Sequence, residues 1–244
     1  YKYDTDKTLT QLQLIGENNQ YIGVINWFAV HPTSMNNTNK LVTSDNVGYA
    51  SILLEKELNP EATIGKGKIV ACFASSNLGD SSPNTNGPKC EYSGMPCDIL
   101  TSSCPPSEGA CFATGPGKNQ FESCKIIATK LFEGAKRLID KRAGREITGH
   151  VKYVHQFIDM STAQVQFFNL TKNASETVSG CSPAMGYSFA AGTTDGPGVM
   201  DFTQGTTTDN PLWNAVRNFL APPTEADIIC QAPKPILLAT GRVN

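Results

Sequence analysis

Half of the eight cysteines recur at seven-residue intervals in a stretch rich in proline, glycine and serine: Cys90, Cys97, Cys104 and Cys111. A further pair, Cys181 and Cys230, flanks a segment dense in glycine and threonine. Zinc knuckles place about two to four residues between paired cysteines, and the six residues between neighbours here are too many for that motif. These six cysteines therefore predict three disulfides, which are typical of a secreted or lumenal protein.

The other two cysteines lie in different surroundings. Cys72 falls in an apolar strand-like run and Cys124 in a helical run, so both are expected to be buried free thiols. Three N-glycosylation sequons, which begin at Asn36, Asn169 and Asn173, agree with the compartment that the disulfides indicate. Together these features predict a protein that is secreted or lies on the extracellular face of the cell surface.

Length and composition exclude several classes. The 244 residues, 39% hydrophobic and 17% charged, can bury a full globular core. A net charge of −2 without a long Lys/Arg run argues against a nucleic-acid partner, because phosphate binding needs a concentrated basic surface. The chain contains no stretch of 18 apolar residues, so no segment of it is expected to span a bilayer. The chain starts in charged sequence and stops just after an apolar run, so we expect both ends to be cut from a longer protein.

Hydrophobic periodicity predicts alternating strands and helices. Residues 9–16 and 21–30 are typical of a hairpin, and the second run is apolar enough for a strand covered on both faces. Further strands are expected at 68–74, 147–158, 163–170 and 235–239, and helices at 45–58, 119–143 and 210–220. Ser44 or Asp45 is the expected N-cap of the first helix. Residues 180–205 are expected to form ordered loops. The prediction is an α/β fold with a mixed central sheet flanked by helices and a disulfide-rich loop at 77–117.

His31 ends the apolar run 21–30 and precedes Pro32. The end of a strand is where α/β folds place catalytic and ligand-binding groups, and a neutral imidazole there could bind a metal or act as a base. The alternative is a histidine that packs at the strand end and bonds a backbone carbonyl. His150 and His155 lie five positions apart in one expected strand, on opposite faces, so they cannot ligate one metal together.

Ser82 lies in the loop that leaves the expected strand 68–74 and precedes Pro83, which favours an extended backbone at the serine. Gly79 would let the chain turn sharply, and backbone amides nearby could stabilise an oxyanion. The pattern differs from the G-x-S-x-G nucleophile elbow. A plain polar turn is the alternative.

Long motifs, in order along the whole chain, closely resemble the neutral ceramidases: "INWFAVHPTSMNNTNKLVTSDNVGYAS" (25–51), "FASSNLGDSSPNTNGPKC" (73–90), "GPGKNQFESCKIIA" (115–128), "GYSFAAGTTDGPG" (186–198), "DFTQG" (201–205) and "APKPILLATG" (232–241). Neutral ceramidases are zinc-dependent amidohydrolases that cleave the N-acyl bond of ceramide to give sphingosine and a fatty acid. The resemblance implies that residues 1–244 are part of the N-terminal catalytic domain of such an enzyme, with upstream and downstream segments absent.

The resemblance also implies roles for single residues. In the "WFA-x-H" motif the histidine is a Zn²⁺ ligand, which falls on His31, and in the "GD-x-SPN" motif the serine before proline is the catalytic nucleophile, which falls on Ser82. The implied disulfides are Cys90–Cys104, Cys97–Cys111 and Cys181–Cys230.

The family's zinc site needs a second histidine, a glutamate and a tyrosine, whose motifs are expected outside this chain. One imidazole cannot hold zinc alone, so the isolated chain is expected to be inactive until the remaining segments of the enzyme are supplied. The implied partners are ceramide or a related N-acyl sphingolipid, with peripheral membrane contact because the substrate is a lipid. The alternatives are a non-catalytic fragment or relative that binds sphingolipid or a protein partner, and an amidohydrolase for another N-acyl lipid.

Overall fold

A computed structural model describes residues 5–79, 81–141, 144–198, 200 and 202–243. The chain divides into two compact units, each considered by itself here. The first unit comprises Tyr1–Lys89, Ser93–Pro96 and Phe112–Ile147, and the second comprises Cys90–Tyr92, Cys97–Cys111 and Thr148–Asn244.

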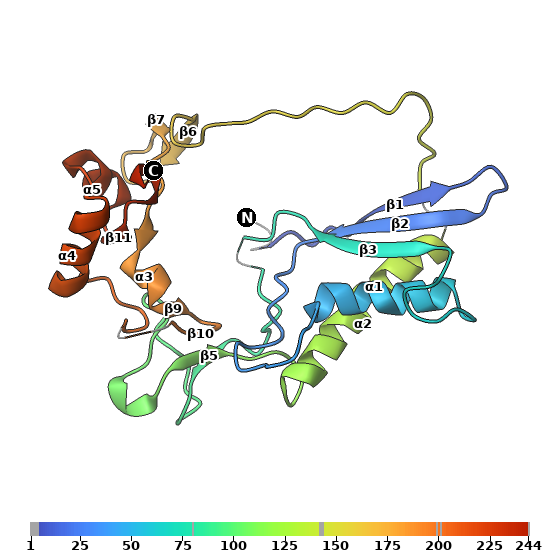
Figure 1. Cartoon of the computed structure of the whole chain (residues 1–244), viewed down its shortest axis with the longest axis horizontal. Coiled ribbons are helices and arrows are strands. Elements are labelled where there is room, and N and C mark those ends of the chain that lie inside the picture. The colour runs from blue at the N-terminus through green and yellow to red at the C-terminus, as the bar shows by residue number, and fades with distance from the viewer. Residues whose placement is uncertain (1–4, 80, 142–143, 199, 201, 244) are drawn as a thin grey trace. The chain divides into compact units, whose positions relative to one another are not determined.

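The first unit is built on a three-stranded sheet. Strand β2 (Tyr21–Phe28) pairs antiparallel with β1 (Thr10–Ile15) and parallel with β3 (Val70–Ser75), which confirms the predicted hairpin and the mixed sheet. Helices α1 (Asp45–Leu58) and α2 (Gln120–Asp140) cover one face of this sheet (Figure 1). Because α1 connects the two parallel strands, β2, α1 and β3 form a βαβ unit.

Two clusters of buried side chains join the helices to the sheet. The first cluster contains Val24, Leu54, Ala71 and Ala135. The second contains Val30, Ala50, Ala128 and Leu131. Alanines at the helix contacts let the backbones of α1 and α2 approach closely, because a methyl group needs little space. Leu54 is fully buried, so its truncation to alanine would cost about 2–5 kcal/mol.

The face of the sheet opposite the helices is covered better at β2 than at its two neighbours. On this face of β2, Gly23 is buried and Ile25 is half-buried, whereas Leu14 of β1 is 42% exposed and Val70 of β3 is 58% exposed. Cys72, which shares this face, is exposed, so its predicted burial is wrong, whereas Cys124 on α2 is buried as expected. Alternation along β3 is the reason, since Ala71 and Phe73 take the positions that face the helices.

Both helices of the first unit begin close to their predicted positions. Helix α1 has Ser44 at its N-cap position, although the Ser44 side chain makes no capping hydrogen bond. The Asn119 side chain caps α2 and accepts from the amide of Glu122. The prediction continued α2 to residue 143, but the helix ends at Asp140, and residues 142–143 lie outside the described residues.

The second unit consists of short elements. The two helices α4 (Pro211–Leu220) and α5 (Glu225–Gln231) lie near the C-terminal end of the chain (Figure 1). Strand β6 (Gln164–Asn169) forms an antiparallel hairpin with β7 (Ala174–Ser179). The remaining elements of the chain are β4 (Pro88–Cys90), β5 (Cys111–Ala113), β8 (Met185–Gly186), α3 (Tyr187–Ala190), β9 (Gly192–Thr193), β10 (Gly196–Pro197), β11 (Ile236–Leu238) and two 3₁₀ turns, Pro106–Glu108 and Thr240–Arg242.

The second half of the chain differs from the prediction at one expected strand and at one helix that was not predicted. Residues 144–159 contain no helix or strand, although 147–158 was expected to be one strand. Its apolar side chains, among them Val151 and Phe157, are exposed, because alternation alone cannot form a strand without a partner. His150 and His155 are exposed as well. Helix α5 was missed within a proline-rich segment, despite the signal of a capping box between Thr224 and Asp227.

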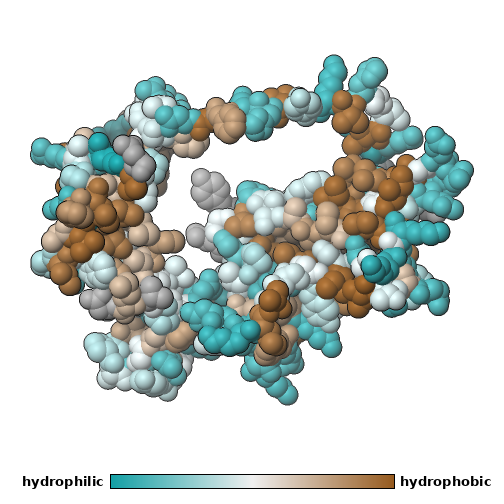
Figure 2. All heavy atoms as spheres, in the orientation of Figure 1, coloured by the Kyte–Doolittle hydropathy of each residue, from teal (hydrophilic) through white to brown (hydrophobic). Residues whose placement is uncertain are grey.

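Helix α4 presents an apolar face to solvent. Leu212, Phe219 and Leu220 are all exposed, and Figure 2 shows hydrophobic side chains gathered over this helix. None of the helices that the structure describes combines the length and the apolar character needed to cross a bilayer.

We expect Asp227 to make the second unit sensitive to acid. Its carboxylate accepts from Arg242 and Thr224, and these contacts hold the pKa of Asp227 well below its usual range. A lowered pKa stabilises the fold fully above the unfolded carboxyl pKa of about 3.9, and this contribution is lost as pH falls through the lower folded pKa. Thermal melts should therefore show that Asp227→Asn narrows the difference in Tm between pH 6 and pH 2.

The matched control is Glu225→Gln, an exposed carboxyl-to-amide change in the same helix. An equal narrowing in both variants would contradict a specific role for the Asp227–Arg242 pair.

Candidate functional site

The parallel pairing of β2 and β3 brings two candidate residues to one edge of the sheet. Phe28 at the end of β2 lies opposite Ser75 at the end of β3, and the amide of Ser76 donates to the Phe28 carbonyl at 3.2 Å. His31 follows β2 within three residues, and the loop that holds Ser82 follows β3. Loops at the carboxyl edge of parallel strands are where α/β folds bind ligands.

The loop after β3 contacts His31 twice. The His31 amide donates to the Ser81 carbonyl at 2.9 Å, and His31 Nδ1 lies 3.3 Å from the same oxygen. Because a carbonyl oxygen only accepts hydrogen bonds, Nδ1 carries the proton in this contact, which leaves Nε2 as the ring nitrogen that could bind a metal. Metal-binding histidines typically bond a backbone carbonyl through the ring nitrogen that does not touch the metal, and this bond orients the ring.

Ser82 is exposed beside this contact. Its Oγ accepts from the amide of Asn84 at 3.1 Å, and the Asn84 side chain donates to the Thr33 carbonyl at 3.4 Å, so the loop of Ser82 is tied to the loop of His31. Gly79 has a φ of +27°, and the Ser81 amide bonds the Leu78 carbonyl at 2.6 Å, which confirms the predicted sharp turn. Asp80 of the motif lies outside the described residues.

The motif at 115–128 lies in the same region of the first unit. The side chain of Asn86 donates to the Gly115 carbonyl at 2.6 Å, and the amide of Gly117 donates to Ser123 Oγ of α2 at 3.0 Å. A Cβ on Gly115 would meet the Ser123 side chain at 2.5 Å, so glycine is required at this close approach. Segments 25–51, 73–90 and 115–128 therefore meet in the first unit.

Asp45 and Asn46, at the start of α1, were not singled out from the sequence as site residues. Both are buried polar side chains, and they bond to the loop that follows His31. Their signal was the Ser-Asp-Asn sequence before an apolar helix, which was interpreted only as an N-cap.

Three buried oxygen atoms have no hydrogen-bond partner within the described part of the chain: Thr33 Oγ1, Asn46 Oδ1 and Ser76 Oγ. Thr33 and Asn46 belong to the His31 region, and Ser76 follows β3 at the same sheet edge. Buried polar atoms without partners are costly, and in native proteins they commonly bond ordered water or a bound group. The sheet edge that holds His31 is therefore suited to binding polar groups.

A surface pocket of about 610 Å³ lies against the segment 32–47. Its lining is chemically mixed, with Met35 and Leu41 beside Asn36 and Thr43. Since neither His31 nor Ser82 lines this pocket, we do not assign it to the substrate.

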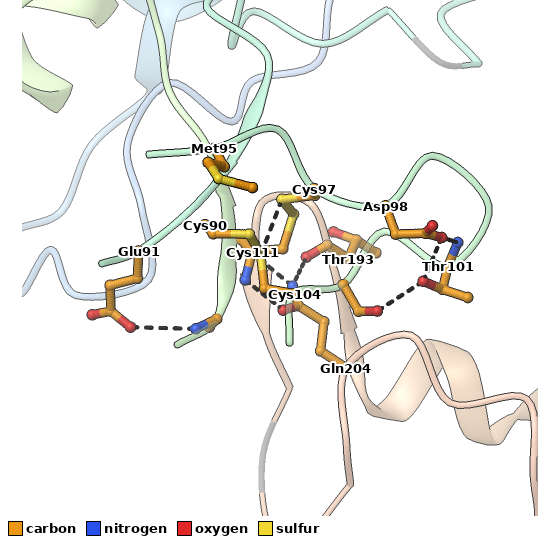
Figure 3. The surroundings of a disulfide bond; sticks show 12 residues. Cys90, Glu91, Met95, Cys97, Asp98, Thr101, Cys104, Cys111, Thr193 and Gln204 are labelled. Atoms are coloured by element: carbon orange, nitrogen blue, oxygen red, sulfur yellow. Dashed lines mark hydrogen bonds between the residues drawn. A yellow bond between two sulfur atoms is a disulfide. The ribbon is translucent and has the colours of Figure 1, made fainter. Parts of the chain in front are cut away.

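Among the described residues, one cluster of three cysteines is close enough to be considered as a metal site. The sulfurs of Cys90, Cys97 and Cys104 lie within 4.8 Å of one another, but disulfides Cys90–Cys104 and Cys97–Cys111 occupy them (Figure 3). An oxidised sulfur is not a thiolate ligand, so this cluster is not a zinc site. Burial raises the pKa of the Cys124 thiol to about 11, with the charge of Asp45 as a smaller cause, so this thiol is a poor ligand and a poor nucleophile.

All three disulfides implied by the family resemblance are present, including Cys181–Cys230. Gln204 bonds the backbone of Cys111 in the Cys97–Cys111 disulfide, as Figure 3 shows. Its Oε1 accepts from the Cys111 amide at 2.8 Å, and its Nε2 donates to the carbonyls of Cys111 at 2.9 Å and Thr193 at 2.6 Å. The "DFTQG" motif thus supplies a side chain that bonds both backbone groups of Cys111.

The family profile described as neutral/alkaline non-lysosomal ceramidase, N-terminal, matches residues 1–244. This chain belongs to that family. The predicted resemblance is therefore confirmed, and the ceramidase-family chain has the predicted α/β fold class.

Relatives of the ceramidase chain come from distant organisms. Neutral ceramidase of Drosophila melanogaster is 58% identical over 100% of the chain, which spans 35% of that protein. Neutral ceramidase B of Dictyostelium discoideum is 45% identical over 100% of the chain and 34% of the relative. The chain thus spans about a third of the length of these relatives.

Solved structures agree with the fold. A ceramidase structure described as complexed with C2 superposes with a TM-score of 0.63 at 29% identity, covering 97% of this chain and 32% of that one. The crystal structure of neutral ceramidase from Pseudomonas aeruginosa, at 24% identity, gives a TM-score of 0.58 over 98% of this chain and 30% of that one, which shows the shared fold.

We expect Gln204→Ala to lower the free energy of unfolding by about 1–3 kcal/mol, because both backbone groups of Cys111 lose a partner. Gln166→Ala is the matched control, since Gln166 makes one exposed side-chain bond to Thr177, and it should change stability by less than about 0.5 kcal/mol. Urea unfolding of both variants tests this. Equal stability of the two would show that Gln204 does not support the disulfide cluster.

Proposed function

We propose that residues 1–244 are part of the catalytic domain of an enzyme that hydrolyses the N-acyl amide of ceramide to sphingosine and a fatty acid. Family membership and the names of the relatives support this substrate. The observation that carries the proposal for this chain is the contact of His31 with the Ser81 carbonyl, which puts an imidazole and the Ser82 loop at one sheet edge. Because the chain spans about a third of its relatives, we expect it to be inactive without the other segments.

His31 would contribute one zinc ligand through Nε2, and the remaining ligands would come from outside this chain. Bound zinc would polarise the amide carbonyl of the substrate and lower the pKa of a coordinated water. The contact of Nδ1 with the Ser81 carbonyl would hold the ring in the ligand tautomer.

Ser82 has a hydroxyl that can act on the substrate. Its oxygen accepts from Asn84, which leaves its own proton free to donate. The hydroxyl would act in one of two roles. In the first role the hydroxyl oxygen would bond the acyl carbon, the C–N bond would break, and the hydroxyl proton would leave on the amine; water would then hydrolyse the acyl-enzyme and release the fatty acid. In the second role the hydroxyl would donate a hydrogen bond to the carbonyl oxygen. Mass spectrometry of enzyme quenched during turnover distinguishes these roles, since only attack adds the acyl mass to the Ser82 peptide.

We place the enzyme outside the cell or on the extracellular face of the cell surface. Three disulfides and the exposed sequon residues Asn36 and Asn173 support an oxidising compartment. A lipid substrate would require at least peripheral contact with a membrane.

In the full-length protein, we expect Ser82→Ala to lower kcat for ceramide at least ~100-fold while zinc content stays unchanged, because the serine acts on the substrate and not on the metal. His31→Ala should lose both zinc and activity. Fatty-acid release and elemental analysis measure these effects.

Two matched controls accompany these variants. Ser93 is an exposed serine whose Oγ accepts from the amide two residues ahead, as Ser82 Oγ does, and His155 is an exposed histidine. Ser93→Ala and His155→Ala should behave as wild type. Retained hydrolysis by Ser82→Ala would remove Ser82 from the mechanism. Wild-type protein that cleaves N-acylethanolamine but not ceramide would overturn the substrate assignment.

A further inference from the structure

The start of helix α1 binds the backbone of the loop that follows His31. Asn46, which is fully buried, donates through Nδ2 to the His31 carbonyl at 3.1 Å and to Ser34 Oγ at 2.8 Å. Asp45 is buried beside it and accepts from the amides of Ser34 at 3.0 Å and Met35 at 2.9 Å. Two adjacent side chains therefore make four hydrogen bonds to residues 31–35.

The backbone of Asp45 is adapted to this contact. Its φ of +53° lies in the left-handed region, which aspartate and asparagine tolerate better than most residues. The Asp45 carboxylate also accepts from the backbone amide of Asn46 at 2.7 Å, so the Asp45 side chain is bonded to the first turn of α1 as well as to the loop. A carboxylate that accepts three backbone amides is held in one orientation.

Asn46 and Ser81 hold His31 at two points. Asn46 fixes the carbonyl of His31, and the Ser81 carbonyl meets the backbone amide and ring Nδ1 of the same residue. With both peptide groups of His31 bonded, the direction of the ring, and hence of Nε2, depends on the start of α1 and on the loop after β3. We propose that Asp45 and Asn46 are positioning residues that set the direction of His31 Nε2.

This inference rests on the proposed metal-binding role of His31. Neither Asp45 nor Asn46 need touch the substrate, because both act through the backbone of the loop. Groups that orient a metal ligand from outside the coordination sphere typically change metal affinity or activity by about 10- to 100-fold when they are removed. Removal of the Asn46 side-chain amide should therefore weaken zinc binding by more than the accompanying loss of stability accounts for.

The other end of α1 supplies a matched control. Asn59 donates through Nδ2 to the carbonyls of Glu55 and Ile69 and accepts from the amide of Ile69, so it also ties a loop to the helix. None of these partners belongs to the His31 or Ser82 loops. Asn59→Ala should thus lower the melting temperature as Asn46→Ala does, with no effect on the site.

The experiment measures zinc affinity of the full-length protein by competition with a chromophoric chelator, alongside Tm, kcat and KM for ceramide. Asn46→Ala should bind zinc about 10- to 100-fold more weakly and lower kcat with KM nearly unchanged. Asn46→Asp, which has the same shape but no side-chain amide to donate hydrogen bonds, should show the same loss of zinc affinity. It replaces Asn46→Ala in the test if the alanine variant does not fold. Asp45→Asn, which keeps an acceptor oxygen and tolerates positive φ, should retain more zinc affinity than Asp45→Ala.

The outcomes separate this inference from the proposed function. If His31→Ala abolishes zinc binding while Asn46→Ala and Asn46→Asp bind zinc as tightly as Asn59→Ala, the positioning role is overturned and the proposed function stands. If His31→Ala binds zinc and turns over like wild type, the metal-binding role of His31 fails, and the positioning inference fails with it.

Discussion

The parallel hydrogen bonding between β2 and β3 is the interaction on which the rest of the first unit depends. Parallel strands place their carboxyl ends at the same edge of a sheet, and the helix that connects them must start near that edge. His31, the start of α1 and the loop of Ser81 therefore converge although they are far apart in the sequence. The helices then bury the inner face of the sheet and hold this edge in place.

Buried polar groups are handled differently in the core and at the edge. Asn26 in β2 is fully buried, and its amide donates to the Cys72 carbonyl while its oxygen accepts from Gln11, so its polar atoms are satisfied. At the edge, the Asn46 side-chain amide donates to the His31 loop, while the Asn46 side-chain oxygen has no partner among the described residues. Such exceptions to local rules are commonest at functional sites, where a group is kept for what it binds or orients.

The second unit is stabilised by other means. Its sheets are two-stranded, and a two-stranded sheet is at best marginally stable by itself. Three disulfides, the Gln204 bonds to Cys111 and the Asp227–Arg242 pair supply the constraints that a larger apolar core would otherwise provide. Hydrophobic side chains remain exposed on α4, in keeping with the small core of this unit.

The sequence by itself determined the local elements and the family. Helices α1 and α4 and the β1–β2 hairpin follow from periodicity, and the long motifs that contain His31 and Ser82 identify the ceramidases. Tertiary structure alone decided the absence of a strand at 147–158, the exposure of Cys72 and the hydrogen bonds of Asp45 and Asn46 to the His31 loop. The physical reason is that a strand needs a partner, burial depends on what packs against a face, and hydrogen bonds between distant residues leave no periodic trace along the chain.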